Sequence, residues 1–269
     1  MPELPEVETT LRGISAHVLG KRIVEIRVRN HSLRWRVELP EEICGQKINR
    51  LTRRAKYLLF HADTGGLILH LGMSGSLTVV SNNAPIGKHD HIDILLEHGQ
   101  VLRFTDPRRF GSIHWHSYPL SAHWLLEKLG VEPLHKDFSG DYLYKRSRGR
   151  RAPIKTFLMD ANVVVGIGNI YANEALFQSG IRPRIAAGRI SQRRYALLAA
   201  SAKSILTAAI DIGGTTLRDF VGGDGKPGYF GQNLSVYGRG GKPCRACRTT
   251  LKGIRVGQRG TVYCPKCQR

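Results

Sequence analysis

The chain has 269 residues, enough for one large domain or two ordinary ones. Hydrophobic residues make up 41% and charged residues 23% of it, which is typical of a folded globular protein and excludes disordered and fibrous classes. The 41 Lys and Arg residues outnumber the 21 Asp and Glu residues, and the net charge of +20 favours nucleic acid as the partner. We find no run of about 18 apolar residues and no secretory signal, so we expect no membrane partner.

The first half of the chain predicts one helix followed by strands. Apolar residues recur at helical spacing over residues 6–19, and Gly20 is expected to end this helix. From Lys21 onward the period changes to two, and strands at such spacing indicate a sandwich or a barrel. The predicted strands cover residues 23–28, 58–61, 67–71, 77–80, 91–96, 101–105 and 112–116.

The second half, after Tyr118-Pro119, has mainly helical patterns. A basic run over residues 145–151 is either a solvated loop or a phosphate contact, and the sequence favours neither. A glycine-rich stretch over 213–231 leads into a segment with four cysteines. The predicted helices cover residues 122–129, 154–159, 170–179 and 192–210.

Four of the five cysteines form two Cys-x-x-Cys pairs that are 16 residues apart in the last 26 residues. This spacing is typical of a tetrahedral zinc site with four thiolates, which has no open position for catalysis. Two disulfides are the alternative. Between the pairs, alternating residues predict a β-hairpin that presents Arg259, in a segment with eight Lys or Arg and no acid. Cys44 is expected to be a small buried apolar residue. The expected zinc ligands are Cys244, Cys247, Cys264 and Cys267.

The chain begins Met1-Pro2-Glu3-Leu4-Pro5-Glu6. Helix initiation alone explains this segment, because proline suits a first helical turn and acids favour its positive end. Removal of Met1 would instead free a secondary amine beside two carboxylates. An α-amino group is neutral at pH 7 far more often than a lysine side chain, so it is the better nucleophile for a sugar C1′. Glu3 would then be placed to act as a general acid.

Motifs along the whole chain resemble those of bacterial formamidopyrimidine-DNA glycosylases, also called 8-oxoguanine DNA glycosylases. The resemblance includes the amino-terminal segment and the cysteines. The other matching segments are Arg53-Arg54-Ala55-Lys56-Tyr57-Leu58, His70-Leu71-Gly72-Met73-Ser74-Gly75, Lys88-His89-Asp90-His91, Thr105-Asp106-Pro107-Arg108-Arg109-Phe110-Gly111, Val165-Gly166-Ile167-Gly168-Asn169-Ile170-Tyr171-Ala172 and Gly225-Lys226-Pro227-Gly228-Tyr229-Phe230.

The resemblance implies an α+β multidomain fold. An amino-terminal helix and an antiparallel β-sandwich would form a catalytic domain over residues 1–118, followed by a helix-two-turn-helix domain over 132–222 and a β-hairpin zinc finger over 235–269. The implied function is base-excision repair, in which a monomeric, cytoplasmic enzyme with one structural Zn²⁺ removes oxidised purines from damaged double-stranded DNA. The same enzyme would cleave abasic sites by β,δ-elimination. DNA would lie between the domains.

Each catalytic role implied by the resemblance falls on a matching residue. Pro2 would be the nucleophile that forms a Schiff base, Glu3 the proton donor, and Glu6 a supporting residue. Lys56 would be a catalytic-site lysine that contacts the phosphate next to the lesion, and Arg259 would be both catalytic and DNA-binding. Residues 213–229 resemble the family's cap over the damaged base.

The resemblance also implies a set of DNA contacts. A base must leave the stack before its sugar can be attacked, so other side chains must fill the gap. Met73 and Phe110 would replace the lost stacking, and Arg108 would donate to the unpaired cytosine; core packing is the ordinary explanation for Met73 and Phe110. His70 and Asn169 would hold the backbone beside the lesion, although Asn169 could also be a simple helix cap. Lys155 is expected among the DNA-binding residues as well.

Three alternatives remain. A non-enzymatic DNA-binding protein would explain the charge and the cysteines but not Pro2 together with Lys56. Endonuclease VIII, the sister enzyme that removes oxidised pyrimidines, has a similar amino terminus and finger but a different wedge. The pattern His89-Asp90-His91-x-Asp93 resembles a second metal site, yet alternating polar residues on a strand need no metal.

Overall fold

The computed structural model describes residues 2–214 and 233–269. The chain divides into two compact units. The first contains Met1–Glu127 and Ile212–Gly231, and the second contains Lys128–Asp211 and Gln232–Arg269. The domain boundaries predicted from the sequence stay predictions, and most of the expected cap at 213–229 lies outside the described residues.

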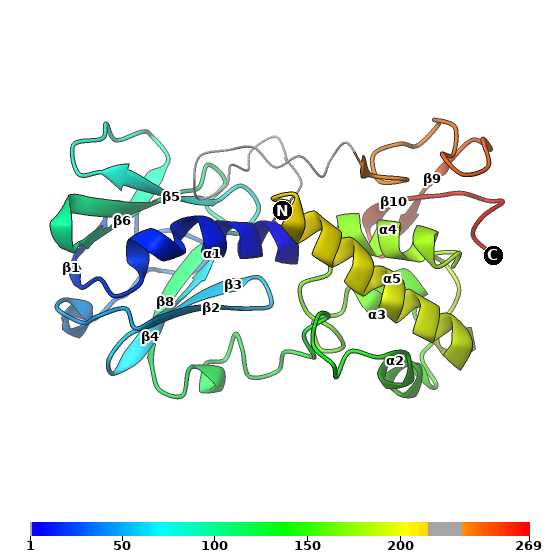
Figure 1. The fold of residues 1–269 in the computed structure, drawn as a ribbon, viewed down its shortest axis with the longest axis horizontal. Helices are drawn as coiled ribbons and strands as arrows, with labels where there is room; N and C mark the ends of the chain where they lie inside the picture. Colours follow the sequence, from blue (N-terminus) through cyan, green and yellow to red (C-terminus); the bar gives the residue numbers. More distant parts are fainter. Residues whose placement is uncertain (1, 215–232) are drawn as a thin grey trace. The chain divides into compact units, whose positions relative to one another are not determined.

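Helix α1 (Leu4–Val18) begins two residues before the predicted start (Figure 1). A capping box fixes this start, because Glu3 and Glu6 each accept a hydrogen bond from the other's backbone N–H. The buried residues Val7, Ile14 and Val18 repeat at helical spacing, and α1 contacts both sheets of the first unit. The helix therefore positions the amino terminus against a rigid core.

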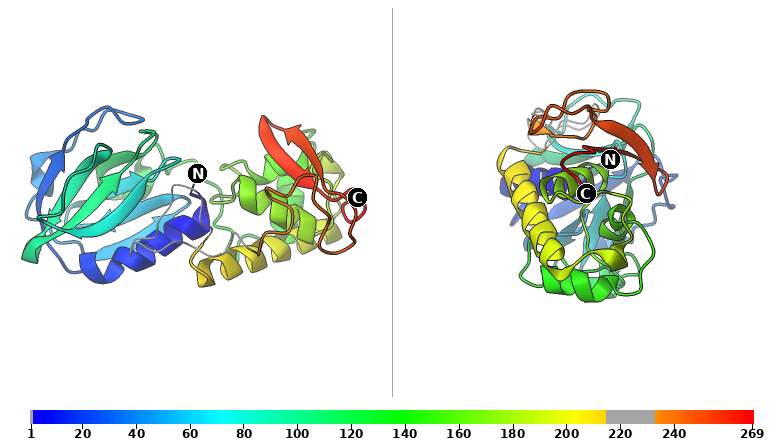
Figure 2. Two further views of the ribbon diagram at one scale, coloured as in Figure 1. Left: turned by 90° about the horizontal axis from the view of Figure 1, so that it is seen from above. Right: turned by 90° about the vertical axis from the view of Figure 1, so that its right-hand side faces the viewer.

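The first unit is a β-sandwich of two antiparallel four-stranded sheets, as predicted (Figure 2). Its core consists of the inward-facing apolar residues of both sheets together with those of α1. One sheet has the order β1-β6-β7-β5, and the other has the order β2-β3-β4-β8. The strands are β1 (Ile23–Val28), β2 (Arg50–Arg54), β3 (Tyr57–His61), β4 (Gly65–His70), β5 (Ser76–Ser81), β6 (Asp90–Leu96), β7 (Gln100–Thr105) and β8 (Ser112–Ser117).

Strand β2 was not predicted, because three of its five residues are arginines and the run lacks apolar alternation. The predicted helix at 122–129 is wrong. Residues 120–122 form a short 3-10 helix, η3 (Leu120–Ala122), and turns follow it. The N–H groups of Leu126 and Glu127 both donate to the His123 carbonyl, so this segment closes in turns and does not continue as a helical hydrogen-bond ladder. The other 3-10 helices are η1 (Glu41–Ile43), η2 (Glu97–Gly99) and η4 (Ala187–Arg189).

The second unit is helical with one hairpin. Helix α3 (Ile154–Leu158), α4 (Asn169–Gln178) and α5 (Gln192–Asp211) lie where helices were predicted. Helix α2 (Gly140–Ser147) was not predicted, although its cap Ser139 accepts a hydrogen bond from the Tyr142 N–H. The hairpin is β9 (Lys252–Val256) and β10 (Arg259–Tyr263).

Among the described residues, no helix is both long enough and apolar enough to cross a membrane.

Candidate functional site

The amino terminus of the first unit is a buried, acidic helix start. Pro2 is buried, Glu3 is 2% exposed and Glu6 is fully buried. The Glu3 N–H donates to Glu6 Oε2 at 2.8 Å, within the capping box described above. Two carboxylates are therefore held within one helical turn of Pro2, and the helix start that explains them structurally also presents them beside a potential amine.

Lys56 and His70 lie at the same end of one sheet. Lys56 belongs to the β2–β3 turn, and the adjacent Tyr57 pairs with His70 at the end of β4. The Tyr57 and His70 rings are 4.9 Å apart. Burial, reinforced by the positive charges of Lys56 and Arg34, lowers the pKa of His70 to about 3.

His70 is therefore neutral at physiological pH. Its Nδ1 accepts a hydrogen bond from the Gly72 N–H at 2.9 Å, so the ring proton lies on Nε2. This tautomer is a fixed donor, and a phosphate oxygen is a suitable acceptor for it. The sequence pointed to this residue, but only the structure shows its charge state.

The three residues expected to fill the gap in the base stack, Met73, Arg108 and Phe110, lie on two loops. The carboxylate of Asp106 joins these loops. Met73 is half-buried, Phe110 is 42% exposed, and the Arg108 guanidinium lies over the Phe110 ring, 5.1 Å from its centroid. An exposed aromatic ring with a cation stacked on it can replace a base in a stack. Phe110 is therefore a surface residue, and core packing does not explain it. Arg108 is exposed beside it.

Asp106 is the joining carboxylate, and sequence reasoning gave it no role. It is fully buried; its Oδ1 accepts from the Ser74 hydroxyl at 2.7 Å and its Oδ2 accepts from the Gly111 N–H at 2.8 Å. The Arg108 N–H lies 3.2 Å from the Ser74 hydroxyl. One buried side chain therefore fixes the loop of Met73 and the loop of Arg108 and Phe110 together.

Lys155, which the sequence places among the expected DNA-binding residues, is a buried residue of the second unit. Its side chain is fully buried, and its Nζ donates to Asn169 Oδ1 at 2.6 Å, to Thr261 Oγ1 at 2.6 Å and to the Gly260 carbonyl at 3.0 Å. Contacts with protein acceptors hold this ammonium between Asn169 and the hairpin residues Gly260 and Thr261. The DNA-binding role expected of Lys155 stays a prediction.

Asn169 is the first residue of α4, and the preceding Gly168 occupies the cap position. Its Oδ1 faces Lys155, so its Nδ2 is directed as a donor away from that contact. The alternative explanation, that Asn169 is itself the helix cap, is therefore wrong. A donor at a helix start is suited to an anion.

Arg259 lies where the sequence predicted, beside the tip of the β9–β10 hairpin. Gly257 and Gln258 form the turn, with φ angles of 55° and 61°. The Arg259 residue pairs with Val256 and is exposed. Its neighbours Gly260 and Thr261 contact Lys155, so Arg259 and Asn169 are both tied to one buried ammonium in the second unit.

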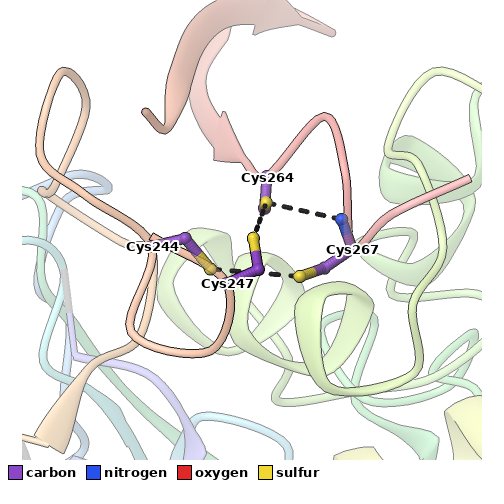
Figure 3. A group of neighbouring side chains, drawn as sticks. All are labelled: Cys244, Cys247, Cys264 and Cys267. Carbon is purple, nitrogen blue, oxygen red and sulfur yellow. Dashed lines mark hydrogen bonds between the residues drawn. The ribbon is translucent and has the colours of Figure 1, made fainter. Parts of the chain in front are cut away.

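The four cysteines predicted as metal ligands converge from two chain segments (Figure 3). Their sulfurs all lie within 4.8 Å of one another, and the distances are 4.0 Å for Cys244 to Cys267 and 3.5 Å for Cys247 to Cys264. A tetrahedral zinc with Zn–S bonds of ~2.3 Å requires sulfurs ~3.8 Å apart, so the donor set fits Zn²⁺. Bonded sulfurs would be ~2.05 Å apart, and the alternative of two disulfides is wrong.

Bound zinc would join the hairpin to the loop at Cys244 and supply folding free energy, with no catalytic part. Cys44, expected to be buried, is exposed. The structure offers no account of a role for it.

Glu174 on α4 is a second residue that sequence reasoning missed. It is 5% exposed, and it accepts hydrogen bonds from the backbone N–H groups of Ser235, Val236 and Tyr237 at 2.8 to 2.9 Å. A buried carboxylate satisfied in this way fixes the chain where it enters the finger. The available signal in the sequence was the single acid of this helix, which lies between Asn173 and Ala175.

The residues of the pattern at 89–93 have structural partners. His91 Nε2 lies 2.8 Å from the Asp106 carbonyl, and Asp93 accepts from Arg103 and Arg29. Asp90 accepts from the Thr105 hydroxyl. These contacts hold β6 to its neighbours, and through Asp106 they support the loop of Arg108 and Phe110.

Comparison with known proteins decides the family. The formamidopyrimidine-DNA glycosylase N-terminal domain model matches residues 1–113, the H2TH domain model of the same family matches 129–221, and a zinc finger found in FPG and IleRS matches 241–269. The chain is 59% identical to the formamidopyrimidine-DNA glycosylase of Stutzerimonas stutzeri and 56% identical to that of Hahella chejuensis, with both chains covered completely in each case. The chain belongs to the formamidopyrimidine-DNA glycosylase family.

Solved structures of the family agree with the fold. MutM (FPG) from Thermus thermophilus matches with a TM-score of 0.90 and 35% identity, over 99% of this chain and 98% of that one. Lactococcus lactis Fpg in complex with abasic-site DNA matches with a TM-score of 0.92 and 33% identity, over 99% of each chain. The predicted fold class, the family and the zinc finger are confirmed. The chain is a DNA glycosylase, so a protein that only binds DNA is the wrong class.

Proposed function

We propose that this glycosylase excises oxidised purines, namely 8-oxoguanine and formamidopyrimidines, from duplex DNA and then cleaves the strand, with Pro2 as the nucleophile. The observation that carries the proposal is the buried pair of carboxylates, Glu3 and Glu6, at the helix start directly after Pro2. Among the relatives, Lactococcus lactis Fpg was solved with DNA containing Fapy-dG and with DNA containing an abasic site.

The chemistry follows from a neutral secondary amine. The Pro2 nitrogen attacks C1′ of the damaged nucleotide, the glycosidic bond breaks, and the base leaves with its electron pair and a proton. Glu3 protonates the ring oxygen as the sugar opens, which gives a cationic imine. The imine accepts the electrons released when the C2′ proton is removed, and the 3′ phosphate is eliminated. Removal of the C4′ proton then eliminates the 5′ phosphate, and water hydrolyses the remaining imine to free the Pro2 amine.

Met1 must be absent for this reaction. While Met1 is attached, the Pro2 nitrogen belongs to an amide and has no nucleophilic lone pair. We expect active protein to begin at Pro2, and intact-mass measurement of active enzyme tests this. A mass that includes Met1 would contradict the mechanism.

The remaining residues bind and distort the DNA. Lys56 contacts the phosphate beside the lesion, and His70, Asn169 and Arg259 hold the backbone through their donors. Met73, Arg108 and Phe110 fill the gap left by the extruded nucleotide. Lys155 acts through Asn169 and the hairpin tip. The enzyme acts as a monomer in the cytoplasm, associated with the nucleoid, and sedimentation at micromolar concentration tests the monomer.

Borohydride reduction during reaction with an 8-oxoguanine duplex tests the nucleophile. We expect a covalent protein–DNA adduct that maps to Pro2, loss of the adduct in Pro2→Gly, and loss in a matched protein with one uncleaved residue ahead of Pro2. An adduct on another side chain would overturn the assignment. Faster excision of thymine glycol than of 8-oxoguanine by the same preparation would favour the activity of the pyrimidine-specific sister enzyme instead.

A further inference from the structure

The turn that carries Lys56 has an unusual backbone. Arg54 pairs with Tyr57, so Ala55 and Lys56 form a two-residue hairpin turn between β2 and β3. Ala55 has a φ of 55°, in the left-handed region that disfavours residues with a Cβ. Such turns normally have glycine or asparagine where φ is positive. Something outside the turn must therefore hold Ala55 in this conformation.

Arg53 makes that contact. Its Nη1 donates to the Ala55 carbonyl at 2.8 Å, two residues further along the chain than its own position in β2. The Ala55 carbonyl belongs to the peptide group that leads into Lys56. Holding this carbonyl fixes the direction in which the Lys56 residue leaves the turn.

The same guanidinium is anchored to α1. Arg53 Nε donates to Glu8 Oε2 at 3.0 Å, and the two side chains are only 10% and 21% exposed. The other Glu8 oxygen accepts from Arg12 Nε at 3.2 Å, one turn along the helix. The contacts therefore run from α1, the helix that begins beside Pro2 and Glu3, through Glu8 and Arg53 to the Lys56 turn.

We propose that Arg53 is a positioning residue for Lys56, with Glu8 as its anchor on α1. Arg53 holds the left-handed turn and sets Lys56 at a fixed distance from the amino terminus of α1. The inference rests on the proposed role of Lys56. The planar fork of arginine is needed because one donor must reach a carboxylate while another reaches a carbonyl, and a lysine ammonium does not reproduce this geometry.

The test measures single-turnover excision of 8-oxoguanine by Arg53→Gln, Arg53→Lys, Lys56→Ala and the double variant Arg53→Gln/Lys56→Ala. A misplacement of about 1 Å in a catalytic site can cost roughly 100-fold in rate, so we expect a loss of roughly 10- to 100-fold in Arg53→Gln. Arg53→Lys should lose nearly as much. Arg27→Gln is the matched control, because Arg27 forms an exposed ion pair with Glu25 elsewhere in the same unit.

Two readouts separate positioning from general stability. In the Lys56→Ala background, Arg53→Gln should have little further effect, because the residue that it positions is gone. Adding Ala55→Gly to Arg53→Gln should recover part of the rate, because glycine adopts a positive φ without strain. If Arg53→Gln does not fold, the cycle is made with Arg53→Lys and with Glu8→Gln.

Full additivity with Lys56→Ala, or a wild-type rate for Arg53→Gln, would overturn the inference while leaving the Pro2 chemistry intact. A wild-type rate for Lys56→Ala, with the borohydride adduct still on Pro2, would overturn both this inference and the role of Lys56. Absence of the adduct in the wild-type protein would overturn the proposed function itself. A non-additive cycle with recovery by Ala55→Gly is the expected result.

Discussion

Replacing Lys155 with methionine removes one buried ammonium and keeps most of the volume of the side chain. The substitution breaks the three hydrogen bonds to Asn169, Thr261 and Gly260. Gly260 is an exposed residue, so its carbonyl can turn to water, and the Thr261 hydroxyl also donates to the Arg259 carbonyl at 3.1 Å. The loss is therefore concentrated at the Asn169 side chain, which no longer has a charged donor to hold its amide.

The expected magnitude follows from that loss. A hydrogen bond to a charged group contributes about 1.5 to 3 kcal/mol, and removal of the costly buried charge offsets part of the total. We expect the second unit to lose about 2 kcal/mol of unfolding free energy. Misorientation of Asn169 and the hairpin tip should also weaken binding to a duplex with an abasic-site analogue by roughly 10-fold, which corresponds to about 1.4 kcal/mol.

The assay is a salt titration of that binding with Lys155→Met, Asn169→Ala and the double variant. Loss of a direct phosphate contact would lower the slope of log K against log salt by about 1. Loss of a buried lysine that acts through Asn169 should leave this slope unchanged. The double variant should bind little worse than either single one. A slope reduced by about 1 would refute this reasoning and support a direct contact of Lys155 with DNA.

Four further predictions follow from the site. Arg259→Ala should weaken binding across DNA sequences and lower the salt slope by about 1, and an unchanged slope would remove Arg259 from the interface. Asp106→Asn, which leaves a poorer acceptor for two loops, should slow excision opposite cytosine while general duplex affinity changes less; equal losses in both would argue against a wedge role. Chelation of zinc should unfold the hairpin and abolish DNA binding without melting the β-sandwich, as seen by calorimetry. Burial lowers the folded pKa of His70 to about 3, so between about pH 3 and 6.5 the unfolded state binds one more proton than the folded state. The unfolding free energy should therefore fall as the pH drops from about 6.5 toward 3, by up to about 1.4 kcal/mol per pH unit. His70→Gln should show a shallower dependence on pH.

The sequence was sufficient where the deciding residues are close together in the chain. The Cys-x-x-Cys pairs, the hairpin at Arg259 and the acids after Pro2 are local patterns with a defined geometry. The strands of the sandwich were found because their apolar residues alternate, whereas β2 was missed because its arginines hide that alternation. Prediction from the sequence was reliable where the residue types and the local spacing of apolar residues indicated the same element.

The remaining features depend on contacts between residues distant in sequence. Asp106 accepts from Ser74, 32 positions earlier, and Lys155 donates to Thr261, 106 positions later. No local pattern indicates that a carboxylate after a strand will bind two loops, or that a lysine in a basic segment will be buried. The same limit applies to Arg53, whose partner Glu8 is 45 positions away on a helix.

The single carboxylate of Asp106 has a consequence for altering which opposite base the enzyme accepts. Exchanging Phe110 or Met73 alone would leave the new side chain on a backbone whose shape the other loop still dictates. Grafting specificity from a related glycosylase should therefore require both loops and their shared acid to be transplanted as one cassette. A substitution in one loop would have to fit a backbone that the other loop, through Asp106, holds in place.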